Sequence, residues 1–122
     1  MANSNDRRID YVEFSVGDIA RSRDFYGKAF GWSFKDYGPS YCEFNDGRLT
    51  GGFALSGKDG SKRGARAGGP LVILYANDLT EIQRRVEEAG GEIVRPPYAF
   101  PGGRRFHFAD PDGYEMAVWS EK

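Results

Sequence analysis

The sequence predicts an α+β fold built from a βαβββ module that occurs twice. In each half of the chain, an alternating strand is followed by an amphipathic helical pattern. Residues 11–19 also align with 71–79 at a constant offset, with a capping aspartate at the same place in each. Neither half is large enough to bury its helix alone, so we expect a shared core. The expected architecture is a curved mixed sheet with helices on its outer face and a concave cup on its other face.

Module one is assigned to residues 9–56 and begins with a half-buried strand at 9–16, where apolar and polar side chains alternate. Asp18 is a favourable N-cap, and the apolar spacing across 19–30 predicts an amphipathic helix that ends at Gly31. Turn residues then separate three shorter predicted strands. These strands are expected at 32–36, 40–45 and 49–56.

Module two is assigned to residues 70–120 and repeats this order. An apolar strand at 70–76 leads through the capping residue Asp78 into a second amphipathic helix, which Gly90 ends. A short strand at 92–95 is expected to stop at two prolines, because proline cannot donate a ladder hydrogen bond. A hairpin completes the module, with strands at 104–109 and 114–119 and the turn Asp110-Pro111-Asp112-Gly113.

Two segments lie outside these modules. Residues 1–8 are polar and are expected to form a flexible tail. Residues 57–69 are rich in glycine and basic side chains. They are interpreted either as a solvated linker or as a cationic lid over an anionic ligand.

Composition and charge exclude several classes of function. The net charge of -1 gives no basis for binding nucleic acid, and no apolar run approaches the ~18 residues needed to cross a membrane. The single cysteine, Cys42, excludes an intramolecular disulfide and fits a reducing compartment. No signal peptide is recognised, so we expect a cytoplasmic protein. Aromatic residues make up 15% of the chain, and some are expected to line a small-molecule pocket.

The chain resembles the vicinal oxygen chelate superfamily, which includes glyoxalase I, bleomycin-resistance proteins and extradiol dioxygenases. The matching segments are 9–14, 18–26, 30–32, 77–79, 89–91 and 108–113. The resemblance implies a single glyoxalase-like domain at 9–120 that binds a small molecule. It also implies a homodimer, with the cup completed at or near the subunit interface. Lactoylglutathione-lyase-like activity is implied by the resemblance alone.

In metal-dependent members of this superfamily, the ligands come from the first and last strands of each module. The corresponding positions here are Tyr11, Gly51, Leu71 and Ala117. Three of them offer no donor side chain, and a phenol with a pKa of about 10 is a poor ligand for a divalent ion. We therefore expect the usual metal site to be absent and predict no cofactor. This argues against glyoxalase I and ring-cleaving dioxygenase chemistry, which depend on the metal.

Three side chains on the predicted cup face are candidates for acid–base catalysis: Glu13, His107 and Glu115. The alternatives are a plain hydrogen-bonded histidine, a salt bridge between either glutamate and Arg105, or an atypical metal site made by the three candidates.

Ligand binding is assigned to Tyr11, Tyr75, Arg105 and Trp119. Aromatic side chains can stack on a planar molecule, and arginine can bind an anion. The leading hypothesis is therefore a metal-free protein that binds a small planar or anionic organic molecule. The other hypotheses are a lyase or isomerase that uses Glu/His acid–base chemistry or an atypical metal, and a regulatory subunit without a substrate.

Overall fold

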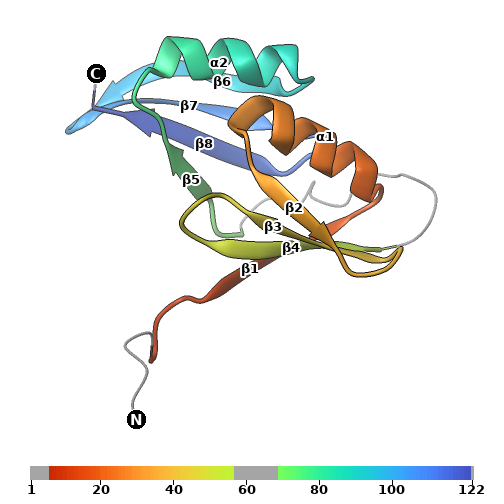
Figure 1. The fold of residues 1–122 in the computed structure, drawn as a ribbon. Coiled ribbons are helices and arrows are strands. Elements are labelled where there is room, and N and C mark those ends of the chain that lie inside the picture. The colour runs from red at the N-terminus through yellow and green to blue at the C-terminus, as the bar shows by residue number, and fades with distance from the viewer. Residues whose placement is uncertain (1–5, 57–68, 122) are drawn as a thin grey trace.

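The computed structural model describes residues 6–56 and 69–121, and its elements follow the predicted order (Figure 1). Module one contains β1 (Tyr11–Val16), α1 (Ile19–Phe30), β2 (Ser33–Asp36), β3 (Tyr41–Asn45) and β4 (Thr50–Leu55). Module two contains β5 (Val72–Tyr75), α2 (Leu79–Glu88), β6 (Glu92–Phe100), β7 (Gly103–Ala109) and β8 (Glu115–Ser120). The predicted βαβββ repeat is confirmed. The predicted lid at 57–69 lies almost wholly outside the described residues.

The strands form two four-stranded mixed sheets, ordered β1-β4-β3-β2 and β5-β8-β7-β6. In each sheet the first strand of the module pairs in parallel with the last, and the remaining pairs are antiparallel. The α+β class is therefore as predicted, but hydrogen bonds do not join the strands into one continuous sheet. β1 and β5 are each an edge strand of their own sheet.

Both helices begin where the sequence predicts. The carboxylate of Asp18 accepts a hydrogen bond from Arg21 N, and Asp78 accepts one from Glu81 N, each at 3.1 Å. Such caps satisfy backbone donors that the first helical turn leaves free. Gly31 ends α1 in the left-handed region, with φ of 73°, where glycine avoids the steric cost of a side chain.

The two modules share one core, which lies between the sheets and includes both helices. Phe25 of α1 contacts Phe108 of β7, with ring centroids 6.0 Å apart. Figure 1 shows α1 next to α2, and the two helices pack together. The buried side chains of Phe14, Met116 and Val118 face this core, as alternation predicts. The predicted sharing of a core is thus confirmed.

The turn at 110–113 ties module two to module one. The carboxylate of Asp112, only 1% exposed, accepts hydrogen bonds from Gly17 N at 2.9 Å and Ser22 Oγ at 3.4 Å. It also pairs with the Arg21 guanidinium at 3.3 Å. Asp110 accepts a hydrogen bond from the Tyr26 hydroxyl at 2.7 Å. The polar side chains of this turn therefore fix how the two modules are placed.

Strand β6 is longer than predicted. It continues through Pro96 and Pro97 to Phe100, whereas the prediction ended it at Arg95. Prolines are tolerated here because β6 is an edge strand and its pairing with β7 shifts register between Arg95 and Tyr98. This irregular segment brings Tyr98 into the site described below.

None of the helices in the described part of the chain is long and apolar enough to span a membrane.

Candidate functional site

Each sheet has an inner face that packs on the core and an outer face that points away from it. On the outer face of the second sheet, paired residues form two rows across the four strands. One row contains Tyr75, Trp119, Arg105 and Tyr98. The other contains Ile73, Ala117, His107 and Arg95. The sequence-predicted ligand residues Tyr75, Arg105 and Trp119 therefore lie on the same face as the candidate catalytic residue His107.

Four polar side chains on this face form a connected cluster, which we call the Tyr98 cluster: Tyr98, Arg105, His107 and Glu115. His107 Nδ1 lies 2.8 Å from the Glu115 carboxylate, and His107 Nε2 lies 3.0 Å from the Tyr98 hydroxyl. Arg105 Nε donates a hydrogen bond to the same hydroxyl. The His107 side chain is 6% exposed, whereas Glu115 is 58% exposed. The cluster thus runs from an exposed carboxylate through a buried imidazole to a half-buried phenol.

Aromatic side chains lie beside the Tyr98 cluster. The Tyr75 and Trp119 rings meet edge to face, with centroids 5.0 Å apart, and Phe100 contacts Trp119 at 6.2 Å. The Tyr75 hydroxyl donates a hydrogen bond to Glu121, which raises the pKa of the Tyr75 phenol. The outer face therefore offers flat apolar surface next to hydrogen-bonding groups, a combination typical of sites for planar organic molecules.

The outer face of the first sheet carries a smaller cluster, which we call the Tyr41 cluster: Tyr11, Glu13 and Tyr41. The Tyr41 hydroxyl lies 2.6 Å from the Tyr11 hydroxyl and donates to Glu13 at 2.9 Å. Burial and these two hydrogen bonds raise the pKa of the Tyr41 phenol. The Tyr41 hydroxyl occupies the space where Gly52 lacks a side chain. Glu13 is thus held by a tyrosine rather than by Arg105.

The structure does not bring the two clusters together within one chain. No hydrogen bond or ion pair between described residues joins the Tyr41 cluster to the Tyr98 cluster. The reason is geometric, because the shared core lies between the inner faces of the sheets and the two outer faces point away from it. The residues assigned to one predicted cup therefore lie on two separate faces of the chain.

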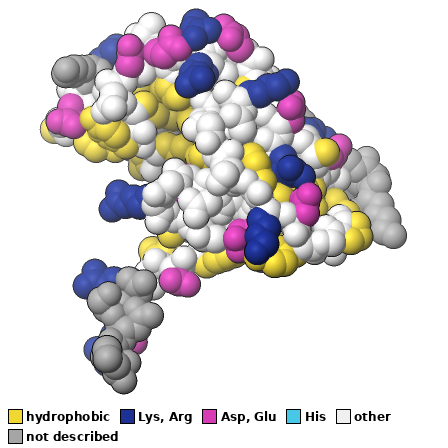
Figure 2. All heavy atoms as spheres, viewed as in Figure 1, with side chains coloured by type: hydrophobic (Ala, Val, Ile, Leu, Met, Phe, Trp, Pro, Cys, Tyr) yellow, Lys and Arg dark blue, Asp and Glu magenta, His cyan; other side chains and the backbone are white. Residues whose placement is uncertain are grey.

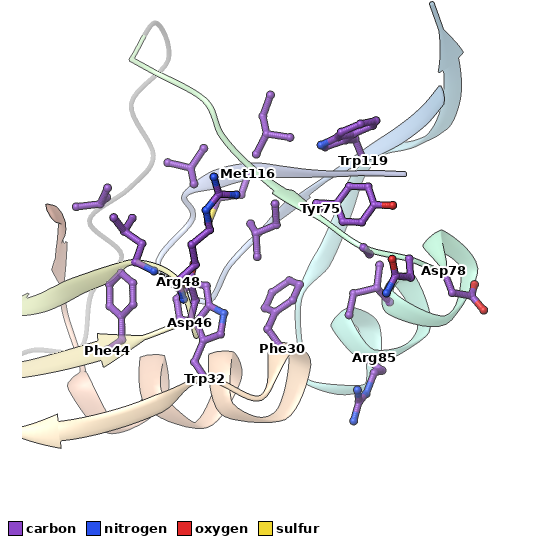
Figure 3. Close-up of a pocket in the computed structure, with 18 of the residues that line it drawn as sticks. Phe30, Trp32, Phe44, Asp46, Arg48, Tyr75, Asp78, Arg85, Met116 and Trp119 are labelled. Carbon is purple, nitrogen blue, oxygen red and sulfur yellow. Dashed lines mark hydrogen bonds between the residues drawn. The ribbon is translucent and has the colours of Figure 1, made fainter. Parts of the chain in front are cut away.

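A groove of about 660 Å³ opens between the two modules, and Tyr75 and Trp119 of the second sheet line it together with core-facing side chains. Figure 2 shows hydrophobic side chains within the hollow that separates the modules. Figure 3 shows Phe30, Trp32 and Phe44 projecting into this groove from module one, and Tyr75, Met116 and Trp119 lining it from module two. The edge strands β1 and β5 both contribute lining residues. The sequence patterns did not predict this groove, because it depends on how the modules are placed.

One of the four positions compared with metal ligands is corrected by the structure. Gly51 lies on the inner face, where it pairs with Val12 and contacts the Phe44 ring. The outer-face residue of β4 is Gly52, which pairs with Glu13 as Ala117 pairs with Ile73. Glycine at either position has no side-chain atom that could bind a metal ion. Among residues 6–56 and 69–121, no three His, Cys, Asp or Glu side chains are grouped so that they could hold a metal ion.

The sequence patterns missed two residues of these clusters, Tyr41 and Tyr98. Tyr41 was placed on a strand, but its contact with β1 depends on the pairing of β3 and β4. Tyr98 follows two prolines, where the sequence predicts no strand. Cys42, in contrast, is fully buried as a small apolar residue, and burial raises the pKa of its thiol.

Residues 8–118 match the Glyoxalase/Bleomycin resistance protein/Dioxygenase superfamily. The chain belongs to this superfamily. Anthracycline biosynthesis protein DauV of Streptomyces sp. (strain C5) is 35% identical over an alignment of 125 positions that covers 87% of this chain and 45% of DauV. Lactoylglutathione lyase GLX1 of Arabidopsis thaliana is 25% identical over an alignment of 131 positions that covers 93% of this chain and 44% of that protein. The chain thus spans about half the length of these curated relatives.

The solved structures agree on the fold. A glyoxalase-related enzyme from Fulvimarina pelagi superposes with a TM-score of 0.77 at 23% identity, covering 93% of this chain and 88% of that chain. Members of the superfamily commonly bind small molecules and form dimers. The predicted superfamily and fold are therefore confirmed.

Proposed function

We propose that this superfamily member is a homodimeric protein that binds a planar, hydroxylated aromatic molecule without the divalent metal of its metal-dependent relatives. The ligand would lie in a cup formed by the outer face of the first sheet of one protomer and the outer face of the second sheet of its partner. The observation that carries the proposal is the division of the polar and aromatic residues into two half-sites on faces that one chain cannot bring together.

The edge strands support a dimer. Ile9, Tyr11, Ile73 and Tyr75 are between 40% and 85% exposed and lie on or directly before β1 and β5. Exposed apolar side chains beside free backbone groups favour association with another chain. The groove between the modules runs along the same two strands, so a second copy seated there would cover it.

The half-sites support the chemistry of the ligand. Trp119 and Tyr75 provide flat surface, while Arg105 and Tyr98 provide polar contacts on the same face. The 35% identity to an anthracycline biosynthesis protein agrees with a ligand of fused rings. We expect binding to quench the tryptophan fluorescence, since Trp119 would stack on the ligand.

The donor groups argue against a divalent metal at the usual place. Ala117 is fully buried beside His107, and both ring nitrogens of His107 already have partners in Tyr98 and Glu115. The remaining superfamily positions offer a phenol and no imidazole, carboxylate or thiolate. Metal analysis of the purified protein should therefore find no stoichiometric divalent ion, and chelator treatment should leave ligand affinity unchanged.

A mixing experiment tests the shared site. Glu13→Ala alters only the first half-site and Arg105→Ala only the second, so each homodimer would have two damaged sites. After subunit exchange in an equal mixture, half of the dimers are mixed and each has one intact site. With alizarin, a planar dihydroxyanthraquinone, as the probe ligand, about one quarter of all sites should then bind with wild-type affinity.

Two outcomes would contradict the proposal. Failure of the mixture to recover any binding would exclude a site made by two subunits. A monomeric mass in analytical ultracentrifugation at the concentration used would do the same, and would favour the groove between the modules as the ligand site instead. Lys28→Ala, an exposed change on α1 outside both half-sites, is the matched control and should leave mass and affinity unchanged.

A further inference from the structure

The hydrogen bonds of the Tyr98 cluster have a defined direction. An ionised carboxylate only accepts hydrogen bonds, so the proton between Glu115 and His107 belongs to His107 Nδ1. In the neutral imidazole the other nitrogen, Nε2, is then an acceptor. The Tyr98 hydroxyl therefore donates to His107 Nε2 across the 3.0 Å that separates them.

The oxygen of Tyr98 retains one free position. A phenol oxygen has one proton to donate and lone pairs that accept. Its proton faces His107, and one acceptor position receives the Arg105 Nε–H. No described residue occupies the remaining acceptor position. Because Tyr98 is half-buried on the outer face of the sheet, a ligand can reach this position.

Two guanidinium groups surround the Tyr98 ring. Arg105 donates to its hydroxyl, and the Arg95 guanidinium lies 3.8 Å from the ring centroid. Glu115 supplies the opposite charge at the far side of His107. Among residues 6–56 and 69–121, no other charged side chain forms an ion pair or hydrogen bond with the cluster. The positive charge beside the phenol would stabilise a negative oxygen on a ligand that contacts the Tyr98 hydroxyl.

The backbone around Tyr98 supports a functional role for the Tyr98 side chain. The register shift between Arg95 and Tyr98 is a bulge-like irregularity in the pairing of β6 with β7. Such irregularities re-aim side chains and are frequent beside active sites. Here the shift places Tyr98 opposite Arg105, so that its hydroxyl meets His107 on the next row of the sheet.

We propose that Tyr98 is a catalytic acid–base residue that moves a proton on a planar hydroxyaromatic or enolisable carbonyl compound. This proposal rests on the proposed function, because the ligand is the one bound at the outer face. The O–H or α-C–H bond of the ligand breaks, and its proton bonds to the Tyr98 oxygen. The original Tyr98 proton passes at the same time to His107 Nε2. The electron pair stays on the ligand as a phenolate or enolate.

The charges and atoms of this step balance without another reactant. The imidazolium that forms keeps its Nδ1–H bond to the Glu115 carboxylate, and the guanidinium groups of Arg95 and Arg105 offset the charge on the ligand. Return of the proton to a different atom of the ligand completes an isomerisation. His107 and Glu115 act through Tyr98 and are therefore positioning residues.

Alizarin, a planar dihydroxyanthraquinone, is the probe, because its neutral and ionised forms absorb at different wavelengths. In a buffer where the free dye is neutral, the wild-type protein should bind it with the spectrum of the anion. Tyr98→Phe should bind it within about threefold of wild-type affinity but with the spectrum of the neutral dye. Glu115→Gln should give a weaker anion band. Tyr37→Phe is the control, since Tyr37 is 51% exposed in a turn of the first module.

A second measurement gives the rate of proton transfer. Exchange of the α-protons of 2-tetralone in deuterated buffer, followed by NMR, should be accelerated by the wild-type protein and slowed about 100-fold by Tyr98→Phe. Absence of alizarin binding would contradict the proposed function. Binding of the neutral dye alone, an anion band that survives in Tyr98→Phe, or no acceleration of exchange by wild type would each overturn the role of Tyr98.

Discussion

Replacement of Asp112 by alanine should weaken the attachment between the two modules. The carboxylate is 1% exposed and accepts hydrogen bonds from Gly17 N, Arg21 Nη2 and Ser22 Oγ. Loss of the acceptor leaves the buried Gly17 amide without this partner, at a cost of about 1–3 kcal/mol. The ion pair with Arg21 adds less than a fully buried pair would, because the Arg21 side chain is 31% exposed.

Together these contributions predict a loss of about 3 kcal/mol in the free energy of unfolding, or roughly a 100-fold change in the folding equilibrium. Urea unfolding followed by circular dichroism measures it directly. Asp36→Ala is the matched control, since the Arg23–Asp36 pair has the same chemistry with side chains 42% and 57% exposed. The control should lose less than about 1 kcal/mol. Equal losses of unfolding free energy in the two variants would refute the conclusion that buried Asp112 holds the two modules together.

Two further predictions concern the sheets and the buried turn. Gly51→Ala should destabilise by about 3 kcal/mol in urea unfolding, because a Cβ there would overlap the Phe44 ring and the backbone of β1. Gly52→Ala should cost less, since only the ends of the Tyr41 and Tyr11 side chains must move, and equal costs would contradict the assignment of the two faces. Burial raises the pKa of Asp110, so its contribution to stability is present below its ordinary pKa of about 4 and is lost as the pH rises through the raised value. Relative to Asp110→Asn, the wild type should thus lose stability as the pH rises above about 4, and a constant difference between their unfolding free energies would contradict the prediction.

Local patterns were sufficient for most of the fold. Alternation in β1 and β8 placed Phe14, Met116 and Val118 on the buried side correctly, because a strand has a side-chain period of two. The capping aspartates and Gly31 marked the helix ends, because these signals act within one turn of the backbone. The candidate site was found in part, since His107, Glu115 and Arg105 lie in one cluster.

The failures share a physical origin in strand pairing. Aligning Gly51 with Ala117 was wrong by one residue, and in a strand a slip of one residue reverses the face. Tyr98 was missed because two prolines normally end a strand, and the sequence does not reveal that β6 lies at an edge with an irregular register.

By itself, the sequence determined the order of the elements and their buried faces, because these depend on interactions between residues close along the chain. It also determined the superfamily, because the matching motifs are short segments of sequence. Only the tertiary structure decided how the two modules are placed, since that depends on contacts such as Asp112 with Gly17, which join residues far apart in sequence. This placement turns the outer faces away from each other, opens the groove between the modules and puts the residues assigned to one cup on two separate faces.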